Sequence, residues 1–428
     1  MTDRTPPPPS LPRRRDRRAV TEVPRHGRLK RPSNWRGLAA LVGAAVAVVA
    51  VSATSIGVIT VANLGGRIQD NAVDISNPDE STPPQIGPIN GSFNLLVVGV
   101  DNDVDQDAAY GERDGVLNDV NILLHVSADH TSATVVSIPR DLITDQPRCT
   151  DPTTGTTSPA QSDVAFNSAM GRGGLGCVVN TAEELTGLDI PYAAQMSFNA
   201  VVQMTDAVGG VPVCLSDDIK DDYSGLDLKA GTNVISGSTA LQFLRTRHGV
   251  GNGSDLSRIS SQQVYMSSLL RQIKSDDTLM NFSRLYSLAN VAATNARLST
   301  SLTSVDTMVS MAQSLRTVNL ETMALVQYPV TDDPDFPGKV VPVVSLADEL
   351  FATIAADRPV VLDDDALGNG SQLNPDVPVE EPAPSVDPAV PTDGSVTGTP
   401  TPEPTTSALG GIKGQTAQQE TCSVGFNG

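Results

Sequence analysis

Two β-rich runs of apolar residues, 120–126 and 133–138, are separated by a short stretch of turn residues and predict an antiparallel hairpin. Charged residues flank the pair, since Asp119 precedes the first run and Arg140 and Asp141 follow the second. An antiparallel hairpin brings the start of its first strand beside the end of its second. We therefore expect Asp119, Arg140 and Asp141 to meet at one edge of a sheet.

A third apolar run, 94–101, also predicts a strand, and it ends in Asp101. Carboxylates and an arginine placed at one end of a sheet by buried strands are typical of a site that binds an anion and a metal ion side by side. Surface turns that carry solvated charges are the alternative interpretation of the same pattern.

Strand-like and helix-like segments alternate from about residue 93 to residue 362, which favours one α/β or α+β domain. Short β-rich runs predict strands, and apolar residues at helical spacing predict helices. Later strands are expected at residues 193–197, 211–215 and 323–330, and helices at 198–208, 239–246, 258–274, 303–315 and 346–355.

Charge is distributed unevenly along the 428 residues, whose net charge is −20. Residues 1–36 hold eleven basic side chains against three acidic ones, which leaves −28 for the rest of the chain. Residues 37–61 carry no charge and are long enough to span a bilayer as one transmembrane helix. Because the basic residues precede this segment, the positive-inside rule places the N-terminus in the cytoplasm and the remainder outside the cell membrane.

The position of the apolar segment favours an uncleaved single-pass anchor over a signal peptide, whose apolar core is shorter and nearer the start. The basic arm is then an orientation signal and a contact for anionic lipids. Nucleic acid is an alternative partner for such an arm, but no helix-turn-helix pattern accompanies it, so we expect no nucleic-acid binding.

Three segments outside the predicted domain have compositions that do not favour folding. Residues 1–36 are rich in Pro and Arg and are expected to be disordered. Residues 62–92 are interpreted as an extracytoplasmic stalk. Residues 363–428 are predicted to be a disordered tail rich in Pro, Asp and Thr, with docking of its last part, 410–428, as the alternative.

All four cysteines follow the apolar segment, where an oxidising environment permits disulfides. Four cysteines allow three pairings. We expect Cys149 to pair with Cys177, because both lie in loop-rich sequence that a short cross-link would pin. Cys214 and Cys422 then form the second pair. The cysteine and histidine spacings do not match a zinc site.

A second group of charged residues contains three arginines in a domain that is otherwise acidic. Arg245 and Arg247 close one predicted helix, and Asp255 stands at the entrance of the next. Arg258 and Gln262 are four residues apart and share a helix face. Guanidinium groups bind phosphate oxygens bidentately, so a diphosphate is the expected ligand. Ion pairing with the surplus acids is the alternative.

Eight short motifs occur in a fixed order: N-L-L-V-V-G-V-D (94–101), N-D-V (118–120), S-I-P-R-D-L (137–142), F-N-S-A-M-G-R-G-G (166–174), E-L-T-G-L-D-I-P-Y (184–192), D-A-V-G-G-V-P-V (206–213), L-D-L-K-A-G (226–231) and L-R-T-R-H-G with D-L-S-R-I-S-S-Q-Q (244–263). This order, with the single N-terminal anchor, resembles the LytR-CpsA-Psr family. The resemblance implies an α/β/α domain with a central mixed β-sheet.

The resemblance also implies a magnesium site beside a diphosphate site. Asp101 and Asp119 match the family's Mg²⁺-binding acids. The residues that match the family's diphosphate site are Arg140, Arg245, Arg247, Asp255, Arg258 and Gln262. The first five of these are the expected catalytic residues. Asp141 belongs to the P-R-D motif and is expected to orient Arg140.

Two more residues are expected to contribute to substrate binding. Asn167 lies where the family has a K-I-N turn, although the lysine position of that turn is Ala165 here. The family's arginine in the R-S-D motif is missing, because Leu117 and Asn118 precede the aspartate. Arg113 could substitute for it from the same loop.

The function implied by the resemblance is transfer of a glycopolymer from a polyprenyl diphosphate carrier to cell-wall peptidoglycan, with release of polyprenyl phosphate. The expected partners are the lipid-linked glycan, the peptidoglycan acceptor and the membrane. With water as the acceptor, the same site would act as a pyrophosphatase. A non-catalytic lipid-binding regulator of envelope genes is the third interpretation. The Ala/Val/Asp/Arg-rich composition with extracytoplasmic cysteines favours an actinobacterial source.

Overall fold

The computed structural model describes residues 72–75, 89–101, 115–152, 154–274, 291, 295–303, 305–377 and 408–426. The predicted cytoplasmic arm and transmembrane segment lie outside these residues, as does Arg113. In the part of the chain that is described, no helix has the length and apolar character needed to cross a bilayer.

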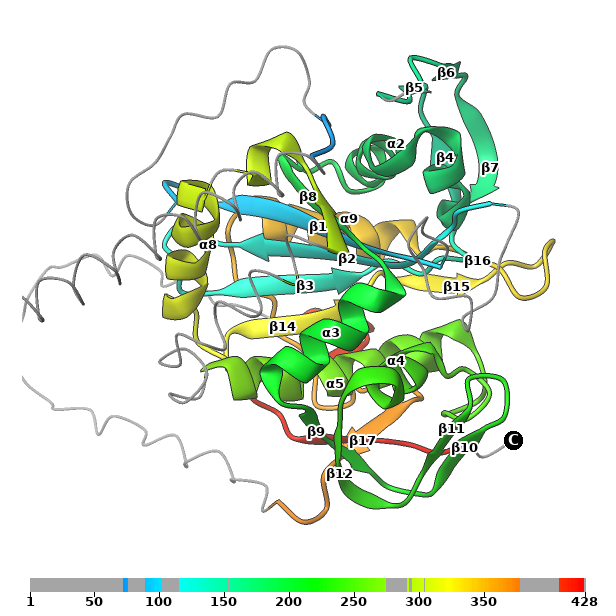
Figure 1. Ribbon diagram of the computed structural model, residues 1–428, viewed down its shortest axis with the longest axis vertical. Coiled ribbons are helices and arrows are strands. Elements are labelled where there is room, and N and C mark those ends of the chain that lie inside the picture. Colours follow the sequence, from blue (N-terminus) through cyan, green and yellow to red (C-terminus); the bar gives the residue numbers. More distant parts are fainter. Residues whose placement is uncertain are drawn as a thin grey trace, which may run out of the picture. The chain divides into compact units, whose positions relative to one another are not determined.

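A seven-stranded mixed sheet forms the centre of the domain (Figure 1). β1 pairs with β8 and β3 pairs with β14 in parallel, whereas the other neighbours are antiparallel. The predicted hairpin is confirmed as β2 and β3. In order across the sheet the strands are β13 (Ala296–Leu298), β8 (Tyr192–Met196), β1 (Phe93–Val100), β2 (Asn118–Val126), β3 (Ala133–Ser137), β14 (Met323–Gln327) and β18 (Gly414–Thr416).

Helices cover both faces of this sheet because successive side chains of a strand point to opposite sides. Leu96 and Val98 pack with α2 and α9, whereas Leu95 packs on the other face with Met266 of α5 and Met311 of α8. The predicted α/β/α arrangement is thus confirmed. The helices are α2 (Ala169–Thr186), α3 (Phe198–Val208), α4 (Gly237–Arg245), α5 (Asp255–Lys274), α8 (Val305–Thr317) and α9 (Val344–Ala355), with the 3₁₀ helices η2 (Phe166–Ser168) and η3 (Thr300–Leu302).

A second sheet of four strands packs against the other side of α5. Its order is β12 (Gly231–Ile235), β9 (Val211–Leu215), β19 (Thr421–Ser423) and β17 (Ser371–Leu373). The described residues also form four two-stranded sheets: β4 (Ile143–Gln146) with β7 (Gln161–Ala165), β5 (Cys149–Thr150) with β6 (Thr157–Ser158), β10 (Ile219–Asp221) with β11 (Leu226–Leu228), and β15 (Val330–Asp332) with β16 (Val340–Pro342).

Helix α5 is buried on its polar face as well as on its apolar one. Ser260, Ser261 and Gln263 are all buried. Ser261 Oγ lies 2.7 Å from Ser423 Oγ of β19, and Gln327 of β14 donates to Ser260 Oγ at 2.8 Å. Small hydroxyl side chains let two sheets approach the same helix while their polar atoms remain hydrogen-bonded.

The prediction of a disordered tail after residue 362 is wrong for residues 363–377 and 408–426. They contain β17, β18 and β19, and the disulfide between Cys214 and Cys422 ties β19 to β9. The domain boundary at residue 93 is also too late, because Val73 pairs with Ser299. Strand pairing with distant partners stabilises these segments although their own composition does not favour folding.

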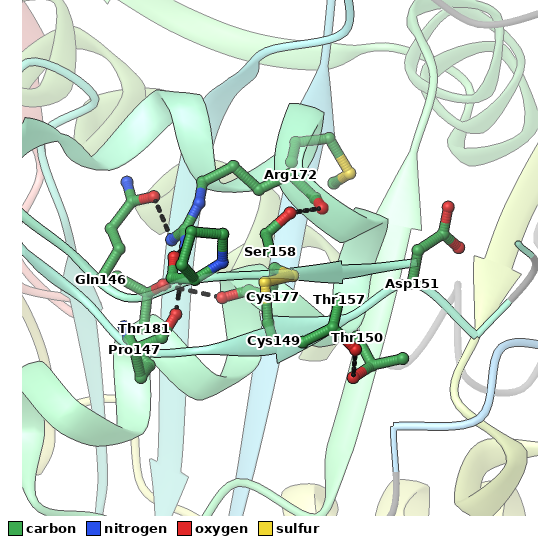
Figure 2. Close-up of a disulfide and its surroundings, with 12 residues drawn as sticks. Gln146, Pro147, Cys149, Thr150, Asp151, Thr157, Ser158, Arg172, Cys177 and Thr181 are labelled. Atoms are coloured by element: carbon green, nitrogen blue, oxygen red, sulfur yellow. Dashed lines mark hydrogen bonds between the residues drawn. A yellow bond between two sulfur atoms is a disulfide. The ribbon is translucent and has the colours of Figure 1, made fainter. Parts of the chain in front are cut away.

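The predicted disulfide between Cys149 and Cys177 is confirmed, with a Cα–Cα distance of 5.4 Å. It joins β5 to α2, and Figure 2 shows Arg172 of the same helix beside it. The Arg172 guanidinium donates to Gln146 Oε1 at 2.9 Å and also to the carbonyl of Pro159. The β5–β6 hairpin is therefore held to α2 by one covalent link and by these hydrogen bonds.

Candidate functional site

The β2–β3 hairpin brings an acid and an arginine together at one end of the main sheet. Asp119 is the second residue of β2, and Arg140 follows the end of β3. Arg140 Nη1 donates to Asp119 Oδ1 at 2.6 Å. Arg140 Nε also lies 3.5 Å from Asp141 Oδ2. The expectation that these three residues meet at one sheet edge is confirmed.

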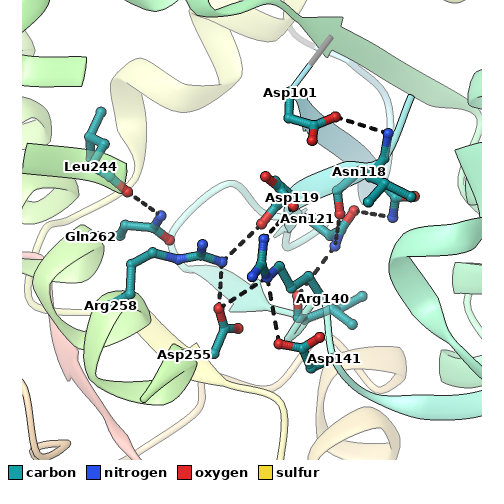
Figure 3. A network of polar contacts seen from close by, with 12 residues as sticks. Asp101, Asn118, Asp119, Asn121, Arg140, Asp141, Leu244, Asp255, Arg258 and Gln262 are labelled. Atoms are coloured by element: carbon teal, nitrogen blue, oxygen red, sulfur yellow. Dashed lines mark hydrogen bonds and ion pairs between the residues drawn. The ribbon is translucent and has the colours of Figure 1, made fainter. Parts of the chain in front are cut away.

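The first turns of α5 reach the same place from the second charged segment. Ser254 begins the helix by accepting from the Ser257 amide at 3.2 Å, which fixes where the next side chains point. Arg258 Nη2 lies 2.6 Å from Asp255 Oδ1 and donates to the Asp119 carbonyl at 3.1 Å. Figure 3 shows how these side chains converge from segments far apart in the sequence.

A small polar cleft opens between the hairpin and the helix. Gln262 is one of its lining residues and donates to the Leu244 carbonyl at 2.8 Å, which ties the end of α4 to the cleft. The charged lining residues are Asp119, Arg140, Asp255 and Arg258. Asp119 and Arg140 of the hairpin motifs therefore line the same cleft as Asp255, Arg258 and Gln262 of the D-L-S-R-I-S-S-Q-Q motif.

Burial and charge act in opposite directions on the two arginines of this cleft. Burial alone would lower the pKa of Arg140, but Asp119 and Asp255 outweigh it and the pKa is raised. Burial dominates at Arg258 and lowers its pKa, although Asp255 partly compensates. Both guanidinium groups stay charged, because arginine is effectively always protonated in proteins.

Arg247 is close enough to this cluster to act on its charges. Burial would raise the pKa of Asp141, but the hydrogen bond from Lys339 and the charges of Arg140 and Arg247 outweigh it and lower the pKa. The positive charge of Arg247 also contributes to the lowered pKa of Arg258, after burial itself and Arg140. Arg247 therefore belongs to the same electrostatic cluster as the hairpin residues.

Three guanidinium groups keep a buried donor that the protein does not satisfy. Within the described part of the chain, the Nε atoms of Arg140, Arg247 and Arg258 have no hydrogen-bond acceptor. Arg140 Nε is 3.5 Å from both Asp141 and Asp255, which is an ion-pair distance without hydrogen-bond geometry. A buried donor without an acceptor raises the free energy of the folded protein. The presence of three such donors in one group of charges therefore favours an anionic ligand with several oxygens.

The other predicted site residues lie near this cluster or outside the part of the chain that the structure describes. The Arg245 guanidinium carbon stands 4.4 Å from the centroid of the Phe198 ring. Asn167 donates its amide to the Arg140 carbonyl at 3.0 Å, so its backbone supports the arginine. Neither residue lines the cleft. The binding roles of Arg245 and Asn167 remain predictions, and Arg113 lies outside the described residues.

Lys339 is a member of the cluster that the sequence motifs did not indicate. It ends the loop between β15 and β16, and its Nζ lies 2.6 Å from Asp141 Oδ1. The loop forms hydrogen bonds within itself, since Asp333 Oδ1 accepts from the Asp335 amide at 2.8 Å and from the Phe336 amide at 3.2 Å. A lysine almost two hundred residues from its partner carries no local signal.

Two carboxylates fit the donor chemistry of the implied magnesium ion. Asp101 is buried, and its Oδ1 accepts from the Leu117 amide at 3.0 Å. Asp119 lies on the neighbouring strand, next to the arginines. No group of three or more potential metal ligands occurs among the described residues. Mg²⁺ commonly takes only one or two carboxylates and completes its shell with water and substrate phosphates, and magnesium binding by this pair remains a prediction.

Comparisons with known proteins agree with the resemblance seen in the motifs. The sequence model of the LytR_cpsA_psr family matches residues 61–345. The chain is 32% identical over 229 residues to the cell wall biosynthesis protein LcpA of Corynebacterium glutamicum, covering 47% of this chain and 43% of that protein. It spans about half the length of the first two curated relatives that it matches.

Two further proteins extend the comparison. The chain is 25% identical over 260 residues to the polyisoprenyl-teichoic acid–peptidoglycan teichoic acid transferase TagT of Bacillus subtilis, covering 59% of this chain and 75% of that protein. A solved LytR-Csp2A-Psr enzyme from Actinomyces oris superposes with a TM-score of 0.47 at 21% identity, covering 66% of this chain and 94% of that one.

Proposed function

This chain belongs to the LytR_cpsA_psr family, and we propose that it transfers a glycopolymer from a polyprenyl diphosphate carrier to peptidoglycan and releases polyprenyl phosphate. The observation that carries the proposal is the cluster of unsatisfied buried Nε donors on Arg140, Arg247 and Arg258. Two linked phosphates offer enough oxygens to satisfy all three. The proposal also places the domain outside the cell membrane, anchored by residues 37–61.

The released product identifies the bond that breaks. A hydroxyl oxygen of the acceptor attacks the phosphorus that carries the sugar, and the bond from this phosphorus to the bridging oxygen breaks. The bridging oxygen leaves with the polyprenyl phosphate, and the hydroxyl proton passes to solvent. Attack at the anomeric carbon would release the diphosphate instead.

The arginines stabilise the charge that develops on the leaving phosphate. Ion pairs with Asp119, Asp141 and Asp255 hold the guanidinium groups of Arg140 and Arg258 in place, so little reorganisation is needed when the charge appears. Such electrostatic stabilisation typically contributes about 10²–10³ in rate per donor group. Asp101 and Asp119 would hold a magnesium ion, which when bound neutralises further phosphate charge.

The direct test supplies the full-length protein with a glycan-labelled polyprenyl diphosphate donor, with and without peptidoglycan. We expect label in the peptidoglycan and an equal amount of polyprenyl monophosphate. Release of monophosphate at the same rate without peptidoglycan would instead indicate a pyrophosphatase. Donor binding without any turnover, and unchanged by addition of peptidoglycan, would indicate a lipid-binding regulator.

Removal of divalent ions with EDTA is expected to abolish transfer, and added Mg²⁺ is expected to restore it. Asp101→Asn and Asp119→Asn should each raise the Mg²⁺ concentration needed for half-maximal activity, because each removes a charged oxygen ligand. Asp376→Asn changes an exposed acid in a distant turn and serves as the control. Full activity in EDTA, or an equal effect of all three substitutions, would contradict the metal assignment.

Lys339→Met is expected to raise the KM for the lipid-linked donor while kcat changes little. Without Lys339, Asp141 is free to compete with the phosphates for Arg140. The expected rise is about two- to fivefold, since a partly exposed ion pair contributes roughly up to 1 kcal/mol. Lys229→Met breaks a similar but exposed pair with Asp218 and should leave KM unchanged. An unchanged KM in Lys339→Met would show that Asp141 does not compete for Arg140.

A further inference from the structure

The loop between α4 and α5 joins two parts of the candidate site, since Arg247 lies at its start and Asp255 immediately follows it. The chain's last described residues lie along this loop. Val250 and Gly425 form an antiparallel bridge, and the Gly251 amide donates to the Val424 carbonyl at 3.0 Å. The loop is therefore held by backbone bonds to a segment more than 170 residues further along.

Further contacts fix both ends of this attachment. The Phe426 amide donates to the Gly249 carbonyl at 3.0 Å. The Phe426 ring lies against Gly253, where a Cβ would stand only 3.2 Å from its Cε2. Gly253 also has a φ of +78°, so this position favours glycine for two reasons.

Residues 368–371, a second segment of the C-terminal region, also pack against this loop. Gly251 has a φ of +50°, and a Cβ there would lie 2.5 Å from Ser257 Oγ and 2.7 Å from the Asn369 carbonyl oxygen. The Val424 amide donates to the Gly370 carbonyl at 3.0 Å. The loop thus has little room to move while residues 368–371 and 421–426 stay in place.

The attachment is anchored covalently and lies outside the region that the family model matches. β19 pairs in parallel with β9, and the disulfide between Cys214 and Cys422 joins the paired residues. The family model ends at residue 345. The anchoring strand therefore lies after the matched region, whereas the loop that it contacts lies within it.

We propose that residues 421–426, which we call the C-terminal clamp, are a positioning element of the candidate site. The clamp holds the loop 249–253 in the conformation that places Arg247 and Asp255 beside Arg140. It contacts the loop and does not line the cleft, so its residues are positioning and not catalytic residues. The inference rests on the proposed function, because it concerns the binding of the same diphosphate.

The test compares two double variants of the full-length protein in detergent. Cys214→Ser with Cys422→Ser releases the clamp, whereas Cys149→Ser with Cys177→Ser removes the other disulfide and leaves the clamp in place. Two quantities are measured: the Kd for inorganic pyrophosphate with Mg²⁺, and amide hydrogen exchange in residues 249–253. A third variant, Phe426→Ala, keeps both disulfides and weakens only the contact with Gly253.

Release of the clamp is expected to raise the pyrophosphate Kd about tenfold, which corresponds to roughly 1.4 kcal/mol, and to speed exchange at Gly251. The control pair should leave the Kd and this exchange unchanged even where it lowers the melting temperature. Phe426→Ala should raise the Kd by a smaller factor.

Two results would overturn the inference: faster loop exchange with an unchanged Kd, or an equal rise of the Kd in both double variants. If the wild type itself binds no pyrophosphate, the proposed function fails. The exchange data then decide separately whether the clamp orders the loop.

Discussion

Replacing Arg140 by alanine is expected to lower the rate of glycopolymer transfer by about 10²–10³-fold, the usual effect of removing one preorganised donor group. Arg140 makes ion-pair contacts with Asp119, Asp141 and Asp255, and its side chain is only 19% exposed. Without it, three carboxylates would face the phosphates and repel them. The measurement is the initial rate of label transfer to peptidoglycan at saturating Mg²⁺.

Two controls separate this effect from a loss of folding. Arg140→Lys retains the charge but not the planar fork, so an intermediate rate is expected. Arg172→Ala removes a hydrogen-bonded arginine beside the Cys149–Cys177 disulfide, and its rate should match that of the wild type. Melting temperatures are recorded for all variants. A rate in Arg140→Ala within about twofold of the wild type would exclude Arg140 from transition-state stabilisation.

Local signals were sufficient to predict most elements of the domain core. Helix α3 spans Phe198–Val208, as expected. Ser197 accepts a hydrogen bond from the Ala200 amide at its start, and Gly209 ends it with a φ of 91°. Both end signals lie within a few residues of the helix, so no knowledge of tertiary contacts was needed.

The core of the candidate site was also predictable, because each charged residue adjoins a regular element. Asp119 and Arg140 flank a hairpin whose register follows from its turn, so their encounter depends on local pairing alone. The approach of Arg258 to Asp119, 139 residues apart, required the family resemblance. Composition and spacing do not encode which helix packs against which sheet edge.

The features that sequence reasoning missed all depend on long-range partners. Lys339 becomes part of the site only because the β15–β16 loop reaches Asp141. Docking of residues 410–428 is only the alternative interpretation of the sequence, yet β18 pairs with β14 and β19 with β9. Unpaired strand edges and a disulfide partner supply the stabilisation that composition alone did not indicate.

The second large effect is expected for the buried pair Asp255 and Arg258, which are 9% and 6% exposed. Arg258→Met should lower the free energy of unfolding by about 3–5 kcal/mol, because it leaves the Asp255 carboxylate buried without its closest counter-charge. The measurement is the urea denaturation midpoint with both disulfides intact. Transfer activity should fall as well, since one of the three Nε donors is lost.

Replacing both partners distinguishes an unpaired buried charge from a loss of packing. Asp255→Leu combined with Arg258→Met should recover most of the stability, because a buried ion pair can often be exchanged for apolar side chains of similar volume. Activity should not return, since the phosphates would still lack this guanidinium group. Lys229→Met opens an exposed pair and should leave the denaturation midpoint unchanged. If the double variant regained transfer together with stability, Arg258 would act only through the fold, and the diphosphate would have to be held by Arg140 and Arg247.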